Sequence, residues 1–177
     1  MSCFDSLFGG KSIETPFERV LALDVYAGPV RGVAFCRDRR EAYLFRLLAW
    51  DSQQENRIFS LSAVPVQSVD RLIAFIAQFE SPRWPEWWVR GGFGDEGLAK
   101  LDAEIMSLER EAAPVDVIVM SKNLLQHLRV KRLVSAEQKG AFERLSVRSP
   151  TSAEVTDAPF AEWVAFLDEP DRLRPRF

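Results

Sequence analysis

The stretch from residue 43 to residue 64, YLFRLLAWDSQQENRIFSLSAV, decides the fold of this chain. It contains two largely apolar runs, 43–50 and 57–64, which are joined by six polar residues. Short apolar runs with period-two alternation are typical of β-strands. The connection is short, and a parallel pair would need a crossover of a dozen or more residues, so the two strands are predicted to be antiparallel.

Two earlier runs extend this pair into a sheet. Residues 20–26 and 30–36 are apolar and rich in strand-forming residues, and Ala27-Gly28-Pro29 separates them. The sequence therefore predicts an N-terminal antiparallel meander of about four strands. Within the third strand, strict alternation divides the side chains between two faces, with Tyr43, Phe45 and Leu47 on one and Leu44, Arg46, Leu48 and Trp50 on the other.

After residue 64 the apolar spacing changes to that of helices. Ser68 is predicted to cap one helix and Asp95 to cap a second that ends before Pro114. The short run 115–120 is apolar and β-branched, which indicates an additional, buried strand. Further helices are predicted near residues 136–146 and 158–168, whereas residues 121–134 fit either a helix or a strand.

Strands followed by helices indicate one α+β domain spanning residues 1–177, with the helices packing on one face of the sheet. We expect residues 1–16 to form a loosely ordered lead-in and residues 169–177 a loosely ordered tail. The length of 177 residues is sufficient for a hydrophobic core without metals or disulfides, and 47% apolar with 28% charged residues is typical of a soluble globular protein.

Charge and cysteine content restrict the function classes. The net charge of −3 argues against general nucleic-acid binding, although residues 121–148 carry seven basic and two acidic residues. Cys3 and Cys36 lack the spacing of a metal site, so we expect no metal, no cofactor and two free thiols, with a disulfide as the alternative. Neither a signal peptide nor a membrane span is evident, so a cytoplasmic location is predicted.

Residues 92–97, GFGDEG, match the spacing of a dinucleotide-binding loop, but their surroundings do not fit one. Pro82 and Pro85 interrupt the preceding segment, where such a loop needs a strand. Asp95 and Glu96 would place two carboxylates where a pyrophosphate should bind. These glycines are predicted to form a tight turn.

The residues around this turn are a stronger indication of function than the glycines. Two adjacent tryptophans in an extended segment cannot both point inward, and Trp and Arg are enriched in protein-binding surfaces. The candidate interaction surface consists of Arg83, Trp84, Trp87, Trp88, Arg90 and Phe93. The alternative is that these tryptophans close the core.

A second group of candidates lies on the predicted sheet. Arg46 is flanked by Phe45 and Leu47, and a charge in such a run must reach solvent or a partner. An ion pair with Asp24 or Asp51 is the favoured explanation, and an anion-binding site is the alternative. Asp24, Arg46, Trp50 and Arg57 could together line a pocket for a small molecule.

No catalytic constellation is recognisable. His127 is the only histidine, and its leucine-rich surroundings indicate a packing role. Cys36 or Ser121 could form a nucleophilic pair with it, but no family signature supports this. We therefore predict a non-catalytic cytoplasmic protein that binds another macromolecule, most plausibly a protein, as an adaptor, regulator or immunity-type inhibitor does. The alternative is a small-molecule binder or enzyme that uses the sheet face.

Overall fold

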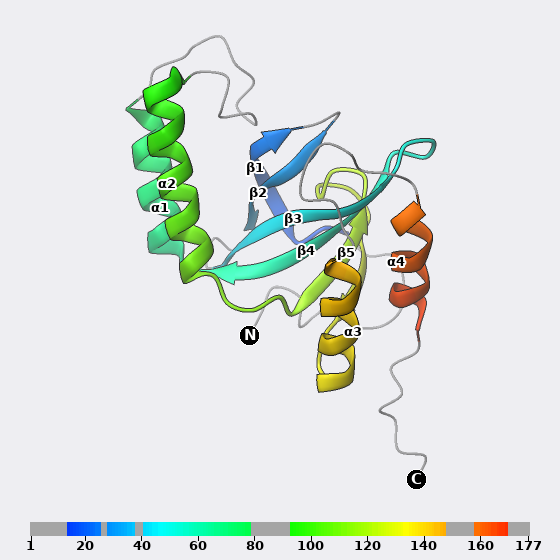
Figure 1. Cartoon of the computed structure of the whole chain (residues 1–177). Helices are drawn as coiled ribbons and strands as arrows, with labels where there is room; N and C mark the ends of the chain where they lie inside the picture. The colour runs from blue at the N-terminus through cyan, green and yellow to red at the C-terminus, as the bar shows by residue number, and fades with distance from the viewer. Residues whose placement is uncertain (1–13, 26–27, 38–40, 79–92, 148–157, 170–177) are drawn as a thin grey trace.

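The computed structural model describes residues 14–25, 28–37, 41–78, 93–147 and 158–169. Within these ranges the protein has an α+β fold in which a six-stranded antiparallel sheet carries four helices (Figure 1). The strands are β1 (Phe17–Val25), β2 (Pro29–Cys36), β3 (Ala42–Asp51), β4 (Asn56–Val64), β5 (Val117–Ser121) and β6 (Arg129–Arg132). The helices are α1 (Val66–Ala77), α2 (Asp95–Glu111), α3 (Ala136–Ser146) and α4 (Ala158–Asp168).

The structure confirms the predicted meander and extends it. The strands lie side by side in chain order from β1 to β6, and every neighbouring pair is antiparallel. Strand β5 confirms the additional strand near residues 115–120. Strand β6 resolves the ambiguous segment 121–134, which contains a short strand and no helix. The predicted helices 136–146 and 158–168 are present as α3 and α4.

The two predicted caps are wrong. Helix α1 begins at Val66 after the N-cap residue Pro65, so Ser68 lies inside the first turn. Its hydroxyl instead donates a hydrogen bond to the carboxylate of Glu111 on α2. Helix α2 has Gly94 as its N-cap, and Asp95 is its first helical residue. There the positive end of the helix dipole favours the carboxylate without a capping hydrogen bond.

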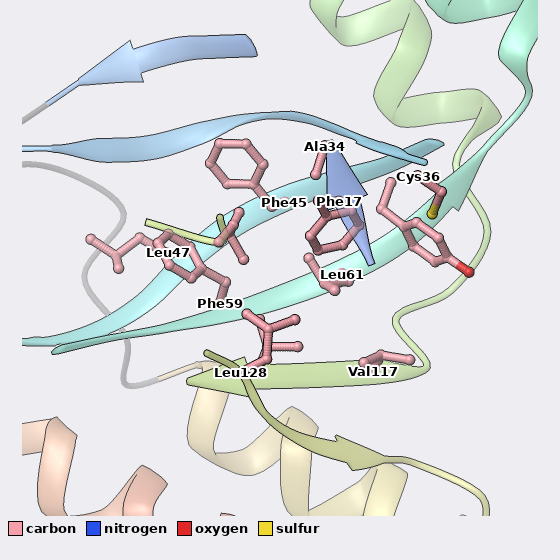
Figure 2. Packing of buried hydrophobic residues seen from close by; sticks show 12 residues of the cluster. Phe17, Ala34, Cys36, Phe45, Leu47, Phe59, Leu61, Val117 and Leu128 are labelled. Carbon is pink, nitrogen blue, oxygen red and sulfur yellow. The ribbon is translucent and has the colours of Figure 1, made fainter. Parts of the chain in front are cut away.

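One face of the sheet is concave and is filled by its own side chains. Figure 2 shows Phe17, Phe45 and Phe59 converging there with Leu128, which follows β5. The two ends of the sheet meet over this face, because the hydroxyl of Thr15 donates to the carbonyl oxygen of Leu124 at 2.6 Å. Among the described residues, no helix takes part in closing this core.

Close packing of β1 against the concave face requires a glycine in β2. A Cβ atom at Gly32 would lie 2.1 Å from the carbonyl oxygen of Leu21 and 2.7 Å from the ring of Phe45. Those distances are too short for any side chain, so only glycine fits at this position.

The opposite, convex face carries all four helices, as predicted. Helices α1 and α2 cover one end of it through a cluster that includes Leu21, Val33 and Leu101. Helices α3 and α4 cover the other end through a second cluster around Trp163, whose ring contacts Phe166 with centroids 6.0 Å apart. Figure 1 shows β3 and β4 crossing between these two helix pairs.

A β-bulge in β3 overturns the predicted alternation of that strand. The pairing of β3 with β4 shifts between Leu47 and Ala49, so one extra residue is inserted. Leu48 packs on the convex face, whereas Trp50 packs against the concave core with Leu47. Trp50 therefore does not share a face with Arg46, because a one-residue shift moves every later side chain to the opposite face.

Candidate functional site

Most of the tryptophan-rich candidate surface falls outside the described residues. This applies to Arg83, Trp84, Trp87, Trp88 and Arg90, whose role as an interaction surface stays a prediction. Phe93 is described and is partly buried. Its ring stacks on that of Phe75 in α1, with centroids 6.1 Å apart and planes 19° apart, and so belongs to the core under α1 and α2.

The four residues of the alternative pocket are divided between two faces of the sheet. Asp24 bonds Arg31, which lies directly opposite Arg46, and these side chains lie on the convex face. Trp50 and Arg57 lie opposite each other on the concave face, with the guanidinium 4.5 Å from the ring centroid of Trp50. The four side chains therefore do not line one pocket.

The side chain of Arg57 is a cation that is buried among residues of the fold. The residue is 3% exposed, and burial lowers the pKa of its guanidinium, an effect that Glu55 opposes. A Cβ at Gly28 would lie 2.8 Å from the Nη2 atom of Arg57. The guanidinium thus packs against both an aromatic ring and a glycine backbone.

The predicted ion pair of Arg46 is absent. Asp24 bonds the Nη2 atom of Arg31 at 3.3 Å, and Asp51 accepts the backbone N–H groups of Gln53 and Gln54 in the turn after β3. The side chain of Arg46 is exposed and forms no ion pair within the described part of the chain.

Arg46 lies on the convex face, and its side chain is exposed rather than part of either helix-covered cluster. Leu44 and Ser62 are opposite each other in the register of β3 and β4, and both are partly exposed beside Arg46. On α2, Glu109 reaches the sheet, and Met106, one turn earlier, is 56% exposed. We call these five residues, Leu44, Arg46, Ser62, Met106 and Glu109, the central strip.

The described residues contain no nucleophilic site. The hydroxyl oxygen of Ser121 accepts the backbone N–H of Leu124 at 3.1 Å and is buried. His127 is exposed, which corrects its predicted packing role. No group of three or more metal-ligating side chains occurs among the residues that the structure describes.

A surface depression of about 500 Å³ lies where β3, β4 and α1 meet. It is lined by Glu41, Ala42, Ala63, Val64, Pro65, Val66 and Gln67. Glu41 is the ionisable group among these residues, and the hydroxyl of Tyr43 donates to its Oε2 atom at 3.3 Å. One carboxylate among aliphatic side chains does not provide the paired groups that acid–base chemistry requires.

Asp116 is a titratable group that sequence reasoning missed. It is half-buried just before β5, and burial raises the pKa of its carboxyl. Arg132 and Lys139 oppose this rise, and Glu41 adds to it. Its Oδ1 atom is buried and has no hydrogen-bond partner within the described ranges. A lone acid directly before an apolar strand was the available signal in the sequence.

The basic residues near β6 are mostly engaged within the fold. Arg129 forms an ion pair with Asp168 of α4. The ammonium of Lys131 donates to the carbonyl oxygen of Glu169 at 2.9 Å and lies 5.0 Å from the ring centroid of Phe166. These contacts hold α4 against the sheet and reduce the charge that is available for an external polyanion.

Cys36 differs from the expectation of a free thiol. It is buried in the concave core and is disulfide-bonded. Cys3, the other cysteine of the sequence, lies outside the described residues. Among the described helices, none has the length and apolar character needed to cross a membrane.

Comparisons of this chain with protein-family models, with curated proteins and with solved structures found no match.

Proposed function

We propose that this protein is a non-catalytic binding protein whose partner is another protein, and that the partner binds at the central strip. The observation that carries this proposal is the exposed side chain of Arg46 on the convex face of the sheet. Partly exposed Leu44 and Ser62 lie on the same face, and α2, which reaches this face through Glu109, carries the exposed Met106. Arg and Met are both enriched in protein–protein interfaces.

A protein partner is favoured over a nucleic acid by the charge distribution. The chain has a net charge of −3, and Arg129 and Lys131 are already engaged with α4. Adaptor, regulator and immunity-type inhibitor are roles that such a surface would serve.

The proposal retains two predictions made from the sequence. The tryptophan-rich segment 83–90 is a second region for partner contact, and the cytoplasm is the expected compartment. The disulfide at Cys36 counts against that compartment, because disulfides persist mainly in oxidising environments.

Site-specific photocrosslinking tests the location of the binding surface. A photoreactive amino acid at position 62 should crosslink one partner in the producing cells, and mass spectrometry would identify it. With both purified proteins, Met106→Arg and Ser62→Arg should each weaken binding by about tenfold or more, the cost of a misplaced charge in an interface core.

Val134→Arg is the matched control, because Val134 is 59% exposed in the connection between β6 and α3. This change adds the same charge away from the strip and should leave the affinity unchanged. Equal losses for all three variants, or no loss for either strip variant, would contradict the proposal.

A further inference from the structure

Arg31 and Arg46 lie directly opposite each other on neighbouring strands of the convex face. Side chains in such pairs have Cβ atoms about 4.5–5.5 Å apart, and like charges there are destabilising. A pair of facing arginines therefore needs nearby anions.

The charge of Arg31 is compensated within the fold. Its Nη1 atom lies 3.0 Å from Oε1 of Glu109 on α2, and its Nη2 atom lies 3.3 Å from Oδ2 of Asp24 on β1. Both interactions are between partly exposed side chains. Arg31 thus shows that a carboxylate above this face of the sheet can form an ion pair with an arginine on the sheet.

Arg46 has no equivalent partner in the described residues. Its cross-strand neighbour on β4 is Ser60, whose hydroxyl donates to the backbone carbonyl oxygen of Arg46 at 3.4 Å. The guanidinium itself is exposed, and its neighbour on the other side is the like-charged Arg31. The fold therefore leaves one cation of the pair available for an anion from outside.

We propose that Arg46 is the anchor of the central strip and binds an Asp or Glu side chain of the protein partner, an inference that rests on the proposed function. A planar guanidinium pairs with a carboxylate through two parallel hydrogen bonds. Leu44, two residues before Arg46 on the same face of β3, is partly exposed and adds apolar surface that suits the rest of a polypeptide segment.

A free phosphate fits this position less well than a single carboxylate. A phosphate dianion would need a second available cation beside Arg46, whereas Arg31, the arginine opposite, is already bonded to Glu109 and Asp24. A phosphate ion also makes no use of the apolar Leu44 beside Arg46. Charge and shape together select an acidic protein segment.

A capped hexaglutamate peptide is the probe for this site, and NMR of the arginine Nε–Hε groups is the measurement. Titration in low salt should shift the Arg46 signal, and added sodium chloride should weaken the binding. Arg46→Gln should reduce the affinity for hexaglutamate by about threefold or more, which is the range expected for an exposed charge-assisted pair.

Arg144→Gln is the matched control, because Arg144 is an exposed arginine on α3, in the other helix pair, and the change removes the same charge. It should leave the affinity for hexaglutamate close to that of the wild type. Equal affinities for wild type and Arg46→Gln would overturn the proposal. So would an equal shift of the Arg46 signal by inorganic phosphate at the same concentration, which would define a site for small anions.

The partner identified by crosslinking separates this inference from the proposed function. If Met106→Arg weakens partner binding and Arg46→Gln does not, the strip is the binding surface and Arg46 is not its anchor. If both weaken binding and Arg144→Gln does not, both proposals are supported. If neither weakens binding, both are overturned.

Discussion

At the scale of single residues, the buried guanidinium of Arg57 packs against both an aromatic ring and a glycine backbone. It lies 4.5 Å from the ring centroid of Trp50, and Gly28, with φ of +135°, approaches it closely. Glycine is required at position 28 for two reasons, since an L side chain rarely adopts that φ and a Cβ would collide with the guanidinium. This arrangement lets a cation remain in a core at 3% exposure.

Gly28→Ala should therefore destabilise the protein by about 1–3 kcal/mol, the cost of a strained left-handed residue together with displacement of Arg57. Gly140→Ala is the matched control, because a Cβ there would meet only Arg144 at an ordinary 3.5 Å in the middle of α3. That change should stabilise the protein by about 0.5–1 kcal/mol. Urea unfolding measures both, and equal effects of the same sign would contradict the account.

Asp116→Asn should stabilise the protein at neutral pH. Because burial raises the pKa of Asp116, the folded state favours the protonated carboxyl, and its charged form carries a cost. This cost is present above the raised pKa and is lost as the pH falls through it toward the ordinary value of 3.8.

The advantage of Asp116→Asn over wild type should accordingly shrink as the pH is lowered and vanish below 3.8, as measured by denaturant unfolding across pH. Glu143→Gln, at an exposed position of α3, is the control for the loss of one carboxylate from the protein. An advantage of Asp116→Asn that grows toward acidic pH would disprove the assignment.

At the scale of elements, helix α4 is attached to the sheet mainly through Trp163. Its side chain is buried at 1% exposure, and its ring centroid lies 5.8 Å from that of Phe142 on α3 and 6.0 Å from that of Phe166. Arg129 and Lys131 add polar contacts from β6 to the end of the helix. One aromatic side chain therefore joins both C-terminal helices to the convex face.

Trp163→Ala should destabilise the protein by about 3–5 kcal/mol, the usual cost of deleting a large buried aromatic side chain. Ala161→Ser, at an exposed position of the same helix, should change stability by less than about 0.5 kcal/mol. Thermal unfolding followed by circular dichroism distinguishes the two variants. A small effect of Trp163→Ala would show that α4 does not contribute to the cooperative core.

The elements were predictable wherever local pattern dominates. Alternation located the meander, and a helical spacing located α3 and α4. Helix α3 also begins with a capping box, which Ser135 forms with Gln138. The sequence of segment 121–134 fitted either a helix or a strand. Its strand β6 forms by pairing with β5, a tertiary interaction that no local sequence pattern records. Ser68 looked like a cap because the sequence does not show that Glu111 of α2 lies beside it.

The candidate site was only partly predictable, and the bulge in β3 is the reason. Arg46 was identified from its charge between two apolar neighbours, and the structure leaves it exposed. Its grouping with Trp50 failed because the inserted residue between Leu47 and Ala49 reverses the faces. A bulge depends on the partner strand, so the sequence of β3 alone cannot reveal it.

At the scale of the whole molecule, labelling of thiols can test directly whether Cys36 is disulfide-bonded. Alkylation of the denatured, unreduced protein should add no mass, whereas alkylation after reduction should add two labels, one for each cysteine in the sequence. Electrophoresis without reductant reports whether the bond joins two chains. Labelling of both thiols without reduction would restore the expectation of free cysteines.

The order of strands in the sheet has a consequence for how the chain folds. Each strand pairs with its neighbour in sequence, and only the connection between β4 and β5 is long, because it contains α1 and α2. Closing a short loop costs less entropy than closing a long one, so pairing of β1 to β4 should form the folding nucleus. Strand β5 and the contact of Thr15 with Leu124 then form after the rate-limiting barrier.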